Sequence, residues 1–164
     1  RQYEDAETLA ISMTEQFPEH HFSWKVLGVI LKQTGRLSES LIANQKSIKL
    51  NSKDVEVHNN MGASLNELGR FEDAEVSYRQ AIALKPDYAD AYNNLGITLK
   101  ELGKLEEAEA SFRQAINLKS NFSEAHNNLG SLLMKIGQHR EGLNEEMKGA
   151  GFISFNLSKG LSIL

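Results

Sequence analysis

Apolar residues return every three or four positions along most of the chain, which is the spacing of one face of an α-helix. In the stretch 89–122 two such runs follow each other, one through Leu95 and one through Phe112. Gly103 separates the two runs, and a glycine there can adopt the left-handed conformation that ends a helix. The pattern therefore predicts two helices joined by a tight turn and followed by a loop.

This unit is repeated along the chain. The stretch "VHNNMGASLNELGRFEDAEVSYRQAI" begins at Val57, "AYNNLGITLKELGKLEEAEASFRQAI" at Ala91 and "AHNNLGSLLMKIGQHREGL" at Ala125. The offsets are 91 − 57 = 34 and 125 − 91 = 34 residues. One short helix pair cannot bury its apolar face alone, whereas stacked identical pairs can. The sequence predicts an all-α, right-handed superhelical solenoid of antiparallel helix pairs with a 34-residue period.

A glycine recurs inside the first helix of each pair, at Gly28, Gly62, Gly96 and Gly130. Glycine within a helix costs about 1 kcal/mol relative to alanine, so its return at one position calls for a structural reason. We expect it to let the two helices of a pair approach closely. Tyr78 and Phe112 are expected to fill the wider space between neighbouring pairs.

Several features of these units resemble the tetratricopeptide repeat: the period, the pair Leu95–Gly96, the alanines on either side of Phe112, and the closing Pro86. The resemblance implies a protein-interaction module and not an enzyme. We expect a repeat domain over 1–148, in which 1–20 is a lone second helix, and a tail or cap over 149–164. The repeats are expected at 21–54, 55–88, 89–122 and, in degenerate form, 123–148.

Two repeats depart from the usual alanine, aromatic residue and alanine of the second helix. The repeat 21–54 has Ser40, Asn44 and Ser47 at these positions. The last repeat has Gly142, Glu146 and Gly149 there. We expect the last second helix to cover its neighbour poorly. Beyond this helix the chain contains a group of apolar residues: Phe152, Ile153, Phe155, Leu157, Leu161, Ile163 and Leu164. We predict that they pack against the solenoid end, a second copy of the chain or a downstream domain. The alternative is a disordered end.

Composition narrows the function. The chain has 164 residues, 40% hydrophobic and 24% charged, as in an ordinary soluble protein. Its net charge of −4 argues against a nucleic-acid or membrane partner, because a phosphate-binding surface needs a basic excess. The absence of cysteine excludes disulfides and thiolate chemistry and suits a cytoplasmic location. Because the chain starts at Arg1 without a methionine, we expect a piece of a longer protein.

No catalytic, metal or cofactor site is predicted. His58 and His126 stand in the column that holds Trp24 and Tyr92 in other repeats, so packing explains them. The remaining histidines have no third ligand at metal-binding spacing. Acidic residues gather at the starts of second helices, where they favour the helix dipole.

Paired asparagines recur in three successive first helices, at Asn59 and Asn60, Asn93 and Asn94, and Asn127 and Asn128. First helices line the concave surface in the tetratricopeptide repeat, so the resemblance implies a ladder of Asn60, Asn94 and Asn128 there. An amide has a donor and an acceptor and can pair with a peptide backbone. The spacing is similar to that in the repeat arm of eukaryotic O-linked N-acetylglucosamine transferases. The alternative is that these asparagines bond to neighbouring helices, and Val26 interrupts the ladder.

We predict a scaffold that binds an extended or helical peptide in this groove. Variable groove residues would give selectivity: Lys25, Val29, Ala63, Ile97 and Ser131. Acidic residues one turn earlier, at Glu56, Asp90 and Glu124, favour a neutral or basic ligand. Two alternatives stay open. In the first alternative, the chain is the substrate-recruiting arm of a larger transferase or oxygenase. In the second, the chain self-assembles through the solenoid ends, the C-terminal end above all.

Overall fold

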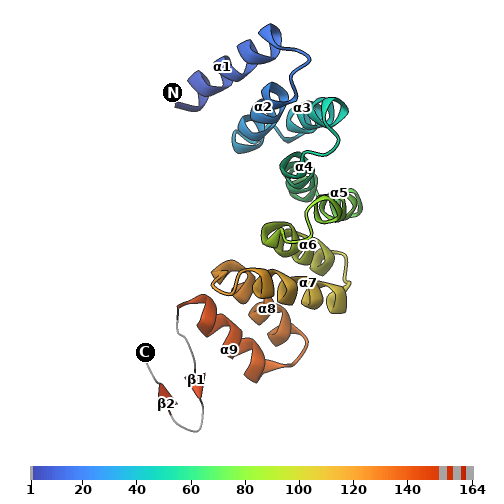
Figure 1. Cartoon of the computed structure of the whole chain (residues 1–164). Coiled ribbons are helices and arrows are strands. Elements are labelled where there is room, and N and C mark those ends of the chain that lie inside the picture. The colour runs from blue at the N-terminus through green and yellow to red at the C-terminus, as the bar shows by residue number, and fades with distance from the viewer. Residues whose placement is uncertain (1, 152–154, 157–159, 162–164) are drawn as a thin grey trace. The chain divides into compact units, whose positions relative to one another are not determined.

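The computed structural model describes residues 2–151, 155–156 and 160–161. Its helices are α1 (Gln2–Gln16), α2 (His21–Gln33), α3 (Leu37–Leu50), α4 (Val55–Glu67), α5 (Phe71–Leu84), α6 (Ala89–Glu101), α7 (Leu105–Leu118), α8 (Ser123–Lys135) and α9 (His139–Gly149). After α1 they follow one another in pairs (Figure 1), and the expected all-α repeat solenoid is confirmed. The right-handed twist and the division into domains stay predictions.

The chain forms two compact blocks, Arg1–Pro86 and Asp87–Leu164, which we call the N-terminal and C-terminal blocks. In the N-terminal block α1 packs on α2, α2 pairs with α3, α3 packs on α4, and α4 pairs with α5. In the C-terminal block α6 pairs with α7, α7 packs on α8, and α8 pairs with α9. Within each block a second helix therefore buries apolar surface against the first helix of the next repeat, as repeat stacking requires.

Glycines end the first helix of each pair, as the sequence predicts. Gly103 has a φ of 75°, in the left-handed region that costs glycine no steric penalty. The next residue, Lys104, donates its backbone N–H to the carbonyl of Leu99 at 2.9 Å, which satisfies an otherwise open carbonyl at the helix end. The chain thereby reverses direction within a few residues.

The glycine inside the first helix allows a close contact within its pair, as expected, and in two repeats that contact is to an aromatic ring. A Cβ atom on Gly96 would stand 2.6 Å from the ring of Phe112, and one on Gly62 would stand 2.7 Å from the ring of Tyr78. The aromatic ring therefore lies against the glycine of its own pair, a contact that the sequence analysis did not predict, and its role between neighbouring pairs stays a prediction. Phe112 is fully buried in this position, which is worth about 1.5–3 kcal/mol.

The repeat 21–54 has a polar interior where its neighbours have an aromatic ring. Asn44 is fully buried and its side chain occupies the space over Gly28. Its Nδ2 donates to Ser40 Oγ at 3.4 Å, and Ser40 Oγ donates to the Gly28 carbonyl at 2.8 Å. Asn44 Oδ1 is buried and has no hydrogen-bond partner among the described residues. This pair of helices therefore gains less from apolar burial than the next pair does.

In the last repeat α9 packs closely on α8, and the expectation of poor cover is wrong. A Cβ atom on Gly130 would stand 2.7 Å from the carbonyl oxygen of Gly142. A Cβ atom on Gly142 would stand 2.6 Å from Met134 Cγ. Gly142 costs helix propensity, but it also removes the side chain that would hold the two backbones apart.

The helix α1 and a short pair of strands stand at the two ends of the described chain. Helix α1 ends at Gln16, and the carbonyl of Pro18 accepts a hydrogen bond from Trp24 Nε1 at 2.7 Å. Beyond Gly151 the strands β1 (Phe155–Asn156) and β2 (Gly160–Leu161) pair antiparallel, with Phe155 opposite Leu161. The other residues of the segment 152–164 lie outside the described residues, and so does the predicted packing of their side chains.

Candidate peptide-binding surface

Three of the predicted ligand-binding residues lie together between α2 and α4. They line a shallow cavity of about 170 Å³, whose lining residues are Lys25, Val26, Val29, Ile30, Glu56 and Asn60. We call this cavity the α2–α4 pocket. The residues come from two first helices of the N-terminal block, and their role in ligand binding stays a prediction. Val26, Ile30 and Glu56 were not among the predicted contact residues.

The charges beside the α2–α4 pocket are paired. Lys25 Nζ lies 2.9 Å from Glu56 Oε2 and 3.1 Å from Asp54 Oδ2. Burial disfavours the ammonium form, but the hydrogen bonds to Glu56 and Asp54 outweigh it and raise the pKa of Lys25 above its ordinary value. Asp54 also caps α4 by accepting from the backbone N–H groups of Glu56 and Val57. Lys25 is therefore fixed in place as a cation.

Asn60 stands at the edge of this pocket with a half-buried side chain. Its backbone carbonyl accepts from Ser64 Oγ at 3.2 Å within α4. In the described part of the chain its side-chain amide makes no hydrogen bond to the protein. Asn60 therefore has the donor and acceptor that a peptide backbone would need.

The C-terminal block presents a second set of predicted residues on α6 and α8. Asn94, Ile97 and Asn128 are half-buried and Ser131 is exposed, so each has surface open to a ligand. Asn128 Nδ2 donates to Asn93 Oδ1 at 2.9 Å, across the two repeats of this block. The structure thus gives Asn128 a bond between neighbouring helices, and its carbonyl oxygen has further capacity to accept. Ala63, the remaining predicted residue, is half-buried on α4.

Asn93 is not part of an open surface, and its place among the ligand-binding residues is corrected. It is 1% exposed, and its Nδ2 donates to Glu124 Oε1 at 3.2 Å. Lys25 stands two repeats earlier at the same position, since 25 + 34 + 34 = 93, and it bonds to Glu56 of the following repeat in the same way. This position joins one repeat to the next.

Asn127, at the same position of the last first helix, also turns away from the predicted ladder. Its side chain is exposed and lies against α9, where a Cβ atom on Gly149 would stand 2.0 Å from Asn127 Oδ1. Gly149 therefore leaves room for this amide. Asn59 is half-buried on α4 and has partners of its own. The second asparagine of each pair remains the better candidate for ligand contact.

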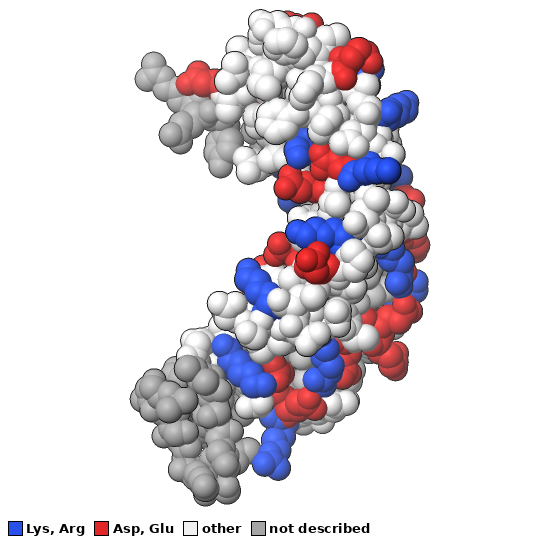
Figure 2. Space-filling model, in the orientation of Figure 1, with Lys and Arg blue, Asp and Glu red and all other residues white. Residues whose placement is uncertain are grey.

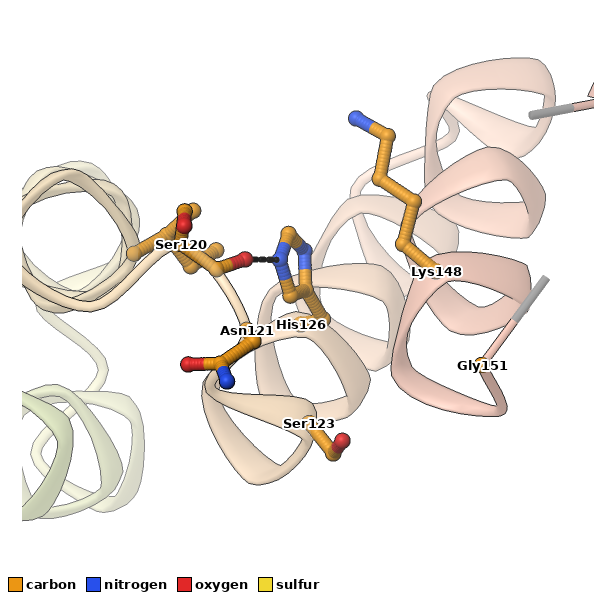
Figure 3. A pocket seen from close by; sticks show the side chains of 7 residues that line it. Ser120, Asn121, Ser123, His126, Lys148 and Gly151 are labelled. Carbon is orange, nitrogen blue, oxygen red and sulfur yellow. Dashed lines mark hydrogen bonds between the residues drawn. The ribbon is translucent and has the colours of Figure 1, made fainter. Parts of the chain in front are cut away.

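A larger cavity of about 470 Å³ lies in the C-terminal block, beside His126 (Figure 3). Its lining residues are Ile116, Ser120, Asn121, Ser123, His126, Lys148 and Gly151. His126 is 6% exposed, and its Nε2 lies 3.0 Å from the carbonyl oxygen of Ser120, the bond drawn in Figure 3. Its Nδ1 lies 2.6 Å from Glu145 Oε2. The histidine thus ties α9 to the loop before α8.

The buried Glu145 carries a charge in this arrangement. Burial raises the pKa of Glu145, but hydrogen bonds from Lys148 and His126 outweigh it, and the pKa lies below its ordinary value of 4.5. Lys148 Nζ donates to Glu145 Oε1 at 2.7 Å. The two His126 nitrogens face Glu145 Oε2 and the Ser120 carbonyl oxygen, so the ring is held from both sides. The sequence placed His126 in a packing column correctly, but gave no sign of this buried ion pair.

Charge is otherwise mixed over the described surface. Figure 2 shows Lys and Arg beside Asp and Glu on the face in view. Among the described residues no three potential ligands stand together for a metal ion. In the same part of the chain no helix is both long and apolar enough to cross a membrane.

The paired helices, the glycine turns and the residues presented by first helices define a helical-repeat scaffold of the kind that binds other proteins. Residues 62–122 of the chain match the tetratricopeptide repeat family. A family model described as "TPR repeat" matches residues 62–103, and one described as "Tetratricopeptide repeat" matches residues 89–122. The comparison with curated protein sequences gives no match.

Solved structures show the same fold. MamA from Desulfovibrio magneticus RS-1 is similar with a TM-score of 0.83 and 19% identity, over 91% of this chain and 84% of that chain. A chain of the APC/C hetero-tetramer Cut9–Hcn1 has a TM-score of 0.82 and 17% identity, over 90% of this chain and 28% of that chain. The first repeat domain of Spaghetti (RPAP3), bound to the HSP90 peptide SRMEEVD, has a TM-score of 0.69 and 25% identity, over 71% and 92% of the two chains.

Proposed function

We propose that the first helices of this scaffold bind an extended peptide segment of a partner protein through its backbone. Asn60 is the contact in the N-terminal block, and Asn94 and Asn128 are the contacts in the C-terminal block. The observation that carries the proposal is the unpartnered amide of Asn60 at the edge of the α2–α4 pocket. A peptide bond offers the N–H and carbonyl that such an amide lacks.

The fold of a relative supports this mode of binding. The similar repeat domain of Spaghetti (RPAP3) holds a short peptide, SRMEEVD. The peptide that suits the present chain differs in charge. The acidic residues on its first helices include Glu56 and Glu124, which lie beside Lys25 and Asn93. The one cation at the α2–α4 pocket is already bonded to two carboxylates, so an acidic ligand gains little there. We propose a neutral or basic segment.

Residues around the contacts supply selectivity in this proposal. Lys25 and Val29 flank Asn60 in the N-terminal block. Ile97 and Ser131 stand one helical turn beyond Asn94 and Asn128 and have open surface. Their side chains differ between repeats, whereas the asparagine is the same in the three repeats from 55 onwards. The asparagines would therefore hold any backbone, and these neighbours would discriminate among side chains.

Selection of peptides from a random displayed library tests the proposal. We expect enriched sequences to be neutral or basic and to shift the backbone amide resonances of α2, α4, α6 and α8 more than those of α3, α5, α7 and α9. Resonances that move mainly on second helices would show a different binding face. Enrichment of acidic peptides would contradict the proposed charge preference.

A further inference from the structure

The asparagine position is occupied by valine in the first complete repeat. Val26 stands where Asn60, Asn94 and Asn128 stand later, since 26 + 34 = 60. An amide at this position can bond to a peptide backbone, whereas valine cannot. Val26 borders the α2–α4 pocket together with Val29 and Ile30. The replacement therefore turns a polar contact point into an aliphatic wall.

This wall is held in place by the core beneath it. Val26 and Ile30 are half-buried, and both pack against the buried cluster of Ala10, Leu27, Leu31 and Ala43. The remaining open part of the wall faces a cavity of about 170 Å³. Since a water molecule takes up about 30 Å³, the cavity has room for about five or six groups of that size. The four carbon atoms of a leucine or isoleucine side chain fit within this volume.

The cation that lines the α2–α4 pocket is already paired. Lys25 is held by Glu56 at 2.9 Å and by Asp54 at 3.1 Å. An acidic ligand side chain entering the pocket would lose water without gaining a free cation, which is costly. An aliphatic side chain would cover Val26 and Val29 and leave the ion pair undisturbed. Charge and shape therefore favour the same kind of occupant.

We propose that the α2–α4 pocket is a specificity pocket for one branched aliphatic side chain of the bound peptide. Asn60, at its edge, holds the peptide backbone beside that side chain. The inference rests on the proposed function for the presence of a peptide, but it concerns a side chain that the asparagines do not recognise. In this repeat Val26 then contributes to recognition of a peptide side chain, whereas the asparagines recognise only the backbone.

Methyl NMR of the whole chain tests the pocket without a known partner. The probe is N-acetyl-leucine N-methylamide, and the matched probe is N-acetyl-alanine N-methylamide. We expect saturable shifts of the Val26, Val29 and Ile30 methyl groups with the leucine compound. The alanine compound should bind at least about tenfold more weakly, because it lacks three apolar carbon atoms. Equal binding of the two compounds, or no shift with the leucine compound, overturns the pocket.

Variants separate the pocket from the backbone contact. Val26→Asn should abolish the preference for leucine, whereas Val76→Asn, at a valine 69% exposed on α5, should leave it unchanged. If Val26→Asn fails to fold, Val29→Asn removes the same wall and gives the same test. A leucine preference that survives either folded variant contradicts the inference.

Asn60→Ala distinguishes the two proposals. It should weaken a library-selected peptide but keep the preference for the leucine probe over the alanine probe, because the two probes carry the same backbone amides. If the leucine probe fails while the selected peptide still depends on Asn60, the pocket is wrong and the proposed function stands. If leucine shifts the methyl groups but Asn60→Ala does not affect the peptide, the backbone contact is wrong and the pocket stands.

Discussion

At the scale of single residues, the glycine inside each first helix faces a different group from one repeat to the next. Opposite Gly62 and Gly96 is an aromatic ring, opposite Gly28 is Asn44, and opposite Gly130 is the backbone of Gly142. The glycine position repeats, but the group that fills its space differs. The sequence predicted the need for a small residue. It could not predict which group would use the space, because that depends on side-chain direction across two helices.

Replacement of Gly96 with leucine should destabilise the protein. The new side chain would begin 2.6 Å from the ring of Phe112, which is fully buried and has no open space to move into. We expect a loss of about 1–3 kcal/mol in the free energy of unfolding, measured by denaturant titration. Ala110→Leu, at an exposed position of α7, is the control and should change stability little. Equal stability of Gly96→Leu and the parent would show that the ring is not confined.

The buried Glu145 should make stability depend on pH. Its pKa in the folded state lies below the ordinary value of 4.5, because of bonds from Lys148 and His126. The stabilisation is therefore fully present above that ordinary value and is lost as the pH falls through the lower, folded-state pKa. Thermal unfolding from pH 7 downwards should show a steeper acid loss in the parent than in Glu145→Gln.

The same variant should be less stable than the parent at pH 7 by about 1–3 kcal/mol, because His126 and Lys148 lose a charged acceptor. Glu106→Gln, at an exposed position of α7, controls for a general effect of charge. Parallel acid unfolding of the parent and Glu145→Gln would contradict the role given to this carboxylate.

At the scale of elements, the helix positions followed from the sequence because the apolar period and the turn glycines agree. The bounds of α6 and α7 fall within the expected unit 89–122, on either side of Gly103. The two asparagines of each pair were harder to place. Adjacent residues in a helix point about 100° apart, so both cannot face one groove. Asn93 is buried and Asn94 is half-buried, because the two side chains point in different directions and Asn93 bonds to Glu124 of the next repeat.

Differences in packing between repeats should appear in amide hydrogen exchange. The pair α2–α3 encloses Ser40 and Asn44, whereas α4–α5 encloses Ala74 and Tyr78. Loss of one buried aromatic ring is worth about 1.5–3 kcal/mol. We expect the amides of α3 to open with a free energy lower than those of α5 by about 1–3 kcal/mol. Stronger protection of α3 than α5 would show that the polar network compensates fully for the missing ring.

At the scale of the whole molecule, the sequence predicted the repeat fold, but it did not predict how the helices pack at the last repeat. The 34-residue period predicts that each helix pair packs on the pair of the next repeat. It carries no information on how an end is closed, because an end has no following repeat to match. The close contact of Gly130 with Gly142 illustrates the point, since the same glycines suggested a weak helix in the sequence.

Truncation tests the prediction that the apolar end of the chain packs on the solenoid or on another chain. A protein ending at Gly151 keeps α9 complete. We expect a lower melting temperature or a lower molar mass in light scattering, because Phe152, Ile153 and their apolar neighbours are removed. A truncated protein with unchanged melting temperature and unchanged mass over a concentration series would show that the segment 152–164 does neither.

The central claim is that the second asparagine of each pair holds peptide backbone. Affinity of a library-selected peptide for the triple variant Asn60→Ala, Asn94→Ala, Asn128→Ala tests it most directly, beside a control with the exposed Asn117 and Asn121 changed to alanine. Each lost hydrogen bond is worth about 0.5–1.5 kcal/mol, so the folded triple variant should bind at least about tenfold more weakly than the parent and the control. Equal affinity of the three proteins would show that these asparagines serve only the scaffold.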